Sequence, residues 1–251
     1  MSFSVNMFGS SLGKKFIMAA SGVVLLGFVV GHLAGNLQIF LGPEALNRYG
    51  AFLHKNVELL WPVRIGLIVL VALHIWSAVQ LSIENKAARP VGYAGDPAAP
   101  AASYASRTML MSGLIVAAFV IYHLLHYTFD VRAINLTGRD FCALVDEKGR
   151  HDVYAMVVLG FEQPIVAGFY TVALALLCLH LSHGIYAMFQ SLGINVSFAP
   201  DLPKHLARWA ALLIFLGYIS IPVAVLGGLG KNYVAKMTAP PAAAAEKEAA
   251  K

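Results

Sequence analysis

The feature that most constrains this chain is a series of five apolar stretches, each long enough to cross a lipid bilayer as a helix. Such a helix needs about 20 predominantly apolar residues. Hydrophobic residues make up 59% of the 251-residue sequence and charged residues only 12%, whereas soluble domains carry about 25% charged residues. The stretches cover residues 16–41, 61–83, 109–129, 164–190 and 207–229. We therefore predict an all-α integral membrane protein with five transmembrane helices and its termini on opposite sides of the membrane.

These stretches divide the chain into three parts. We expect an N-terminal segment over residues 1–15, a transmembrane domain over 16–230, and a low-complexity, disordered tail over 231–251. In a membrane protein, the net charge of +5 favours basic residues at lipid headgroups over nucleic acid binding. A cytoplasmic N-terminus would leave fewer Lys and Arg residues inside than outside, so the charge count leaves the orientation open.

The segments that connect the predicted spans give weaker indications of structure. In the first, a Gly–Pro break precedes apolar residues at helical spacing, Leu46, Tyr49 and Leu53, which predicts a short helix at the surface. The third connection, residues 130–162, is the longest and most polar, and we expect it to fold over one face of the bundle. No internal repeat is evident along the chain.

Six of the nine histidines lie inside the predicted spans, where ionisable side chains are costly and usually functional. Helical rise places His32 and His123 at one depth, about 25 Å from the interface at which the first span begins. It places His74 and His180 at a second depth, about 15 Å from the same interface. Four helices thus contribute one histidine each at two levels. Each of His123 and His180 is followed three residues later by a further histidine, His126 and His183 respectively, which lies on the same helix face and is an alternative ligand.

Two histidines at one depth on different helices can ligate a planar cofactor from opposite sides. Imidazole binds iron well, and bis-histidine haem suits electron transfer because no coordination position is open to oxygen. Zinc would usually recruit cysteine or carboxylate, and no Asp or Glu lies beside these histidines to extend a proton relay. The sequence lacks C-x-x-C-H, which excludes c-type attachment. We predict two stacked b haems within the first four helices, one ligated by His32 and His123, the other by His74 and His180.

Motifs in the first four spans carry a family resemblance. They are "SSLGKKFIMAASG", "GHLAGNL", "ALHIW", "FVIYHLLHY" and "FYTVALALLCLHLSHGIY". Over residues 9–230 the chain resembles the di-haem cytochrome b subunit of succinate:quinone oxidoreductases, of the five-helix type found in succinate dehydrogenases and fumarate reductases that use menaquinone. The resemblance implies that His32 and His123 hold a distal haem and that His74 and His180 hold a proximal haem.

The resemblance also implies a place in a respiratory complex. The chain would be a multi-pass membrane anchor in the bacterial cytoplasmic (inner) membrane, with its N-terminus cytoplasmic and its C-terminus outside. A flavoprotein subunit with FAD would carry out the succinate or fumarate chemistry, and an iron–sulfur subunit would exchange electrons with the proximal haem. The haems would connect that subunit to a quinone site near the distal haem. This chain would not bind succinate or nucleic acid, and the oligomeric state of the complex is left open.

Further residues receive roles from this comparison. Glu58, at the outer start of the second span, is a candidate for proton exchange at the quinone site. Arg64 is a candidate partner of a haem propionate, since arginine forms strong charge-assisted bonds, and His126 and His183 are candidate propionate or neighbouring partners. Some fumarate reductases of this type carry a glutamate two residues before the ligand in the fourth span. This chain has Cys178 there, which argues against proton transfer by that residue.

Three alternatives remain open at this point. The chain could be the haem b subunit of another respiratory oxidoreductase, of the nitrate reductase or formate dehydrogenase type, although the motifs match those less well. It could be a proton-coupled transporter with a histidine relay and no cofactor. It could also be a purely structural anchor whose histidines only form hydrogen bonds between helices.

Overall fold

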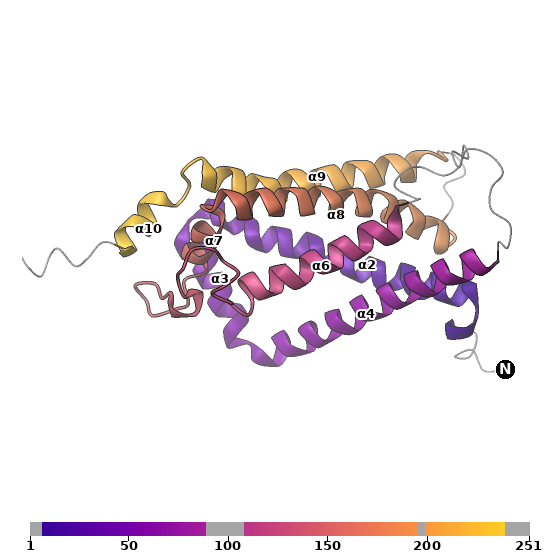
Figure 1. The fold of residues 1–251 in the computed structure, drawn as a ribbon, viewed down its shortest axis with the longest axis horizontal. Coiled ribbons are helices and arrows are strands. Elements are labelled where there is room, and N and C mark those ends of the chain that lie inside the picture. Colours follow the sequence, from indigo (N-terminus) through magenta and orange to yellow (C-terminus); the bar gives the residue numbers. More distant parts are fainter. Residues whose placement is uncertain (1–6, 89–107, 195–198, 239–251) are drawn as a thin grey trace, which may run out of the picture.

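The computed structural model describes residues 7–88, 108–194 and 199–238. Within these ranges five helices are long and apolar enough to cross a membrane, which confirms the predicted all-α architecture and transmembrane character. Figure 1 shows them running along the long axis of the molecule. They are α2 (Ser11–Asn36), continued by the 3-10 helix η1 (Leu37–Leu41), α4 (Val57–Ala87), α6 (Met109–Tyr127), α8 (Pro164–Ser191) and α9 (Leu202–Leu226).

The first long helix begins earlier than its apolar stretch. The Ser10 hydroxyl accepts a hydrogen bond of 3.0 Å from the main-chain N–H of Gly13 and so caps α2. Lys14 is buried, and its ammonium group forms an ion pair with Glu84 near the end of α4. Residues 11–15, which the sequence placed in the N-terminal segment, therefore belong to the bundle, because the side chains of Ser11 and Lys14 both have Glu84 of α4 as a partner.

The predicted short helix in the first connection is confirmed. Gly42 turns the chain with φ +96°, a conformation that only glycine adopts readily, and α3 (Pro43–Lys55) then begins with proline in its first turn. Its apolar face packs on the bundle. A Cβ on Gly35 of α2 would lie 2.9 Å from the hydroxyl of Tyr49, so glycine at this position allows α3 to approach α2 closely.

The long helices pack in an uneven bundle. Helices α8 and α9 lie side by side, and α2 contacts both α4 and α8. Helix α4 lies at the edge of the bundle (Figure 1), and none of its most apolar 18-residue stretch is buried. That exposed apolar surface is what a helix facing lipid is expected to have.

The main hydrophobic core lies at one end of the bundle, where residues 130–162 fold over the helix ends. The centre of this core is α7 (Val153–Phe161), in which every residue after Val153 is buried. Around it lie α3, η2 (Phe141–Ala143) and α10 (Lys231–Thr238). We call this assembly of α3, η2, α7, α10 and the intervening loop the end cap.

The expected disordered tail begins with a helix instead. Residues 231–238 form α10 because two of their side chains find partners in the end cap. The ring of Tyr233 packs edge-on against Tyr154 of α7, with ring centroids 5.2 Å apart, and Val234 is buried. Residues 239–251, the rest of that tail, lie outside the described ranges.

Buried polar groups hold the end cap together. The carboxylate of Asp152 caps α7 by accepting from the main-chain N–H of Ala155 at 2.9 Å. It also accepts from Nδ2 of Asn47 at 3.0 Å and from the Tyr233 hydroxyl at 2.7 Å. Asn47 in turn accepts from the main-chain N–H of Tyr154 at 2.9 Å. One carboxylate and one amide therefore join α3, α7 and α10.

Candidate functional site: two facing pairs of histidines

Four histidines from four helices meet in two pairs between the long helices. His32 of α2 and His123 of α6 have ring centroids 5.7 Å apart and ring planes at 79°. His74 of α4 and His180 of α8 have centroids 6.5 Å apart and planes at 65°. All four side chains are half-buried. These are the same two pairs that helical depth predicted, so the histidines the sequence singled out do lie together in space.

The hydrogen bonds of His74 fix which of its nitrogens carries the proton. Its Nδ1 lies 3.1 Å from the main-chain oxygen of Met18 and 3.1 Å from the hydroxyl oxygen of Ser21, both on α2. A carbonyl oxygen can only accept, so Nδ1 must carry the hydrogen. In the neutral ring Nε2 then carries no hydrogen and has a lone pair, and a neutral imidazole of this kind can ligate a metal.

His180 is held in a corresponding way. Its Nδ1 lies 3.2 Å from the hydroxyl oxygen of Ser112 on α6, and that hydroxyl donates its hydrogen to the main-chain oxygen of Met109 at 3.1 Å. Because a hydroxyl has one hydrogen, Ser112 must accept from His180. As in His74, Nδ1 is the donor, and Nε2 carries a lone pair and no hydrogen.

The pair formed by His32 and His123 has aromatic surroundings. The Tyr170 hydroxyl of α8 lies 3.3 Å from Nδ1 of His123 and 3.0 Å from Nδ1 of His126, so it donates to one ring and accepts from the other. His32 stacks on Phe28, one turn earlier in α2, with centroids 5.3 Å apart. Aromatic rings thus pack beside both members of the pair.

The remaining candidates lie elsewhere. His126 is fully buried, stacked on Tyr127 with centroids 3.9 Å apart, and its Nε2 has no hydrogen-bond partner among the described residues. His183 is half-buried on α8. Glu58 is exposed in the first turn of α4, and the Arg64 guanidinium packs over the ring of Trp61 at 5.6 Å.

Sequence reasoning missed three residues that contact the histidine pairs, namely Ser21, Ser112 and Tyr170. A polar side chain within a membrane-spanning helix needs a partner there. All three residues are polar and lie within predicted spans, so this rule could have marked them as candidates. Their spacing from the histidines could not be interpreted without knowing which helices are neighbours.

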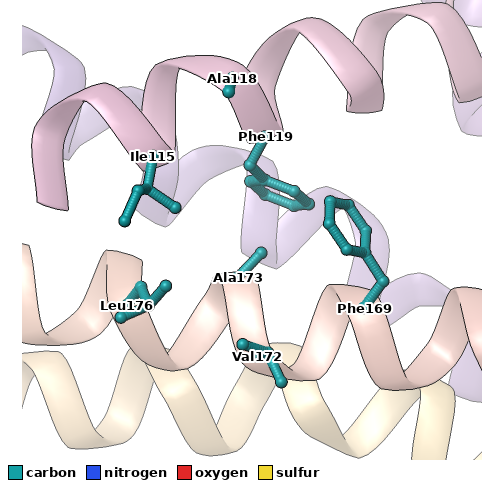
Figure 2. Close-up of a pocket in the computed structure, with 7 residues that line it drawn as sticks. All are labelled: Ile115, Ala118, Phe119, Phe169, Val172, Ala173 and Leu176. Carbon is teal, nitrogen blue, oxygen red and sulfur yellow. The ribbon is translucent and has the colours of Figure 1, made fainter. Parts of the chain in front are cut away.

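An apolar hollow of about 170 Å³ lies between α6 and α8. Figure 2 shows Phe119 and Phe169 facing each other at one end and Ile115 and Leu176 at the other. Ala118, Val172 and Ala173 complete the lining. With no polar side chain in its wall, the hollow offers apolar contact and no group for catalysis.

The donor set restricts what the histidine pairs could hold. Among the described residues, no three His, Cys, Asp or Glu side chains gather as a metal-binding group. A bare zinc ion, which takes four ligands, therefore does not fit either pair. Two opposed imidazoles suit a metal that brings its own equatorial ligands, as iron does in haem.

No protein-family model, curated protein or solved structure matches this chain. Its class is therefore defined by its own fold and site. Over the residues that the structure describes, it is all-α and of transmembrane character, with five long apolar helices and two facing pairs of histidines.

Proposed function

We propose that this chain is the di-haem cytochrome b membrane anchor of a succinate dehydrogenase or fumarate reductase. It would carry electrons between an iron–sulfur subunit and membrane quinone, menaquinone by resemblance. The succinate or fumarate chemistry would take place on a flavoprotein subunit with FAD. The proposed location is the bacterial cytoplasmic membrane, with the N-terminus inside and the C-terminus outside.

The observation that carries this proposal is the separation of the paired rings. A bond between a first-row metal and an imidazole nitrogen is about 2 Å long, so one metal between two opposed imidazoles holds their ring centroids about 6 Å apart. The centroid separations are 5.7 Å for His32 and His123 and 6.5 Å for His74 and His180. The protonated Nδ1 atoms of His74 and His180 leave Nε2 available in both rings.

Each part of the chain then has a physical role. Bound haem would supply a one-electron carrier, and one pair of histidines would hold each haem. The helices hold the rings at fixed depths, and hydrogen bonds to Nδ1 orient those rings and make them more basic ligands. The apolar side chains around the pairs keep water out.

The auxiliary roles are part of the same proposal. Glu58 would exchange protons with quinone at the outer end of α4, where its exposed carboxylate can reach water. Arg64 would leave its cation–π contact with Trp61 to pair with a propionate. His126 and His183 flank the ligands on α6 and α8, and the burial of His126 favours a role beside His123 over one at the surface.

The test is a reduced-minus-oxidised absorbance spectrum of the purified complex, with haem quantified per copy of this chain. We expect two b haems. His32→Ala or His123→Ala should remove one haem, His74→Ala or His180→Ala should remove the other, and the control His205→Ala should remove neither. A colourless wild-type chain would overturn the proposal in favour of a proton relay or a structural anchor. Co-purification without an FAD-containing subunit would favour a different respiratory complex.

A further inference from the structure

Helices α2 and α6 carry the same spaced motif. Each contains Ser-Gly and, after nine further residues, His: Ser21, Gly22 and His32 in α2, and Ser112, Gly113 and His123 in α6. The interval from Ser to His is three helical turns, about 16 Å, so Ser and His lie on nearly the same side of the helix. The first and third long helices therefore share this spaced motif, although no longer internal repeat is evident in the sequence.

The two copies of the motif make equivalent contacts. Ser21 of α2 bonds Nδ1 of His74 on α4, at 3.1 Å, and Ser112 of α6 bonds Nδ1 of His180 on α8, at 3.2 Å. In each copy the serine contacts the histidine of the next long helix along the chain.

The glycine after each serine lies against the same ring atom. A Cβ on Gly22 would lie 3.5 Å from Cε1 of His74, and a Cβ on Gly113 would lie 3.3 Å from Cε1 of His180. Each Ser-Gly dipeptide thus presents a hydroxyl to one edge of an imidazole and leaves room for the ring beside it.

Four of the five long helices described therefore form two equivalent helical hairpins, α2 with α4 and α6 with α8, and α9 packs beside α8. Each hairpin contributes one histidine to each pair. Two such units facing each other place matching histidines opposite one another, which suits a planar group that is ligated identically from its two sides.

We infer that Ser21 and Ser112 are matched positioning residues for the cofactor held by His74 and His180. This rests on the proposed function. Each serine uses its own hydrogen within its helix, Ser21 toward the Ile17 carbonyl at 2.7 Å and Ser112 toward the Met109 carbonyl at 3.1 Å. Each is therefore restricted to accepting from Nδ1–H of the opposite ring. The two bonds anchor both rings and keep the hydrogen on Nδ1, so that Nε2 of each ring carries a lone pair.

The two serines are not equally important. His74 has a second acceptor for its Nδ1–H, the Met18 carbonyl oxygen at 3.1 Å. For His180, Ser112 is the acceptor that the described part of the chain provides. Removing the Ser112 hydroxyl should consequently free its histidine more completely than removing that of Ser21.

The experiment compares Ser112→Ala and Ser21→Ala in the intact complex, by optical redox titration and low-temperature electron paramagnetic resonance of both haems. Loss of the bond makes the imidazole a poorer donor, so the midpoint potential of the His74/His180 haem should rise, more in Ser112→Ala than in Ser21→Ala. The haem of His32 and His123 is an internal control and should not change. Ser112→Thr and Ser21→Thr, which keep the hydroxyl, should restore the wild-type values.

Ser77→Ala is the matched control variant. Ser77 is a fully buried serine of α4 whose hydroxyl donates to the main-chain oxygen of His74 at 3.0 Å rather than to the ring. It should leave both potentials unchanged. Wild-type potentials in Ser112→Ala, or an equal shift of both haems, would overturn the inference while leaving the proposed function standing. A wild-type complex with no haem would overturn both.

Discussion

The hydroxyl of Tyr170 lies 3.0 Å from Nδ1 of His126, so a fully buried imidazole of α6 is tied to α8 by one hydrogen bond. The other ring nitrogen of His126 has no partner in the described part of the chain. This bond is therefore the polar contact that compensates for burying the ring.

Tyr170→Phe should destabilise the protein by about 1–3 kcal/mol, because it leaves both nitrogens of a buried histidine unsatisfied. Thermal unfolding of the detergent-solubilised complex measures the loss. Tyr186→Phe, which removes an exposed hydroxyl bonded to Gln190 at 2.9 Å, is the matched control and should have little effect. Equal melting temperatures for the two variants would contradict the expected role of Tyr170.

Gly113→Ala should perturb the site more than Gly22→Ala. The added Cβ would lie 3.3 Å from Cε1 of His180 in the first case and at an ordinary contact distance of 3.5 Å from Cε1 of His74 in the second. The crowded ring must move by a few tenths of an ångström, and overpacking of this kind costs about 1–3 kcal/mol. Haem content and paramagnetic resonance spectra measure the effect.

Gly31→Ala provides the baseline for that comparison, since a Cβ there meets nothing within 4 Å. It should be neutral or slightly stabilising, because alanine favours helix over glycine by up to about 1 kcal/mol. Indistinguishable haem spectra for Gly113→Ala and Gly31→Ala would show that the ring has room to spare.

Asn47→Ala should loosen the end cap by about 1–3 kcal/mol, because it leaves a buried main-chain N–H at Tyr154 without its acceptor and removes a donor to Asp152. Limited proteolysis of the loop between α6 and α7, together with thermal unfolding, measures the change. Asn56→Ala, which loses an exposed bond to the Phe52 carbonyl at 2.7 Å, serves as control. Unchanged protease resistance in Asn47→Ala would mean that apolar packing alone holds the cap.

The end cap should also loosen at low pH through Glu44. The Arg150 guanidinium bonds its carboxylate at 2.6 Å, and Arg150 and then Lys148 lower the pKa of Glu44 from 4.5 to about 2. A lowered folded-state pKa means that the stabilisation is complete above about pH 4.5 and is lost as the pH falls through about 2. Hydrogen exchange of residues 139–152, corrected for intrinsic rates, should rise across that window.

In Glu44→Gln this loop should exchange faster already at neutral pH and respond less to acidification. Asp146 should add to the loss of stability at low pH. Burial raises its pKa, but hydrogen bonds from Arg150 and from main-chain N–H groups outweigh burial, so the pKa is lowered overall. High salt should weaken the exposed Glu44 pair. An identical pH profile in Glu44→Gln and wild type would exclude this ion pair as the cause.

Much of the fold could be predicted from the apolar stretches, because a membrane demands long continuous helices with their backbone bonds satisfied internally. The fourth predicted span, residues 164–190, differs from α8 by one residue. The first span was predicted too short, since the partners of Lys14 and Ser11 on Glu84 are set by packing. Helix α7 was not anticipated, because nine apolar residues within a polar connection are too few to signal a span.

The histidine pairs could be predicted because helical rise converts residue number into depth without knowledge of packing. The residues that hold the rings could not be predicted in that way. Whether Ser112 contacts His180 depends on which faces of α6 and α8 meet, and Tyr170 contacts two histidines at once only because it lies opposite the gap between them. Such contacts depend on how each helix is rotated about its own axis. Because apolar residues surround most of each helix, the sequence does not specify that rotation.

The bond between Tyr233 and Asp152 has a consequence for biosynthesis. A chain emerges from the ribosome N-terminus first, and α10 is the last helix described, after α9. The hydrogen bond from Tyr233 to the carboxylate of Asp152 can therefore form only after α10 has been synthesised. We expect all four histidines of the two pairs to have been synthesised before α10 completes the end cap, so that cofactor loading need not wait for this last contact.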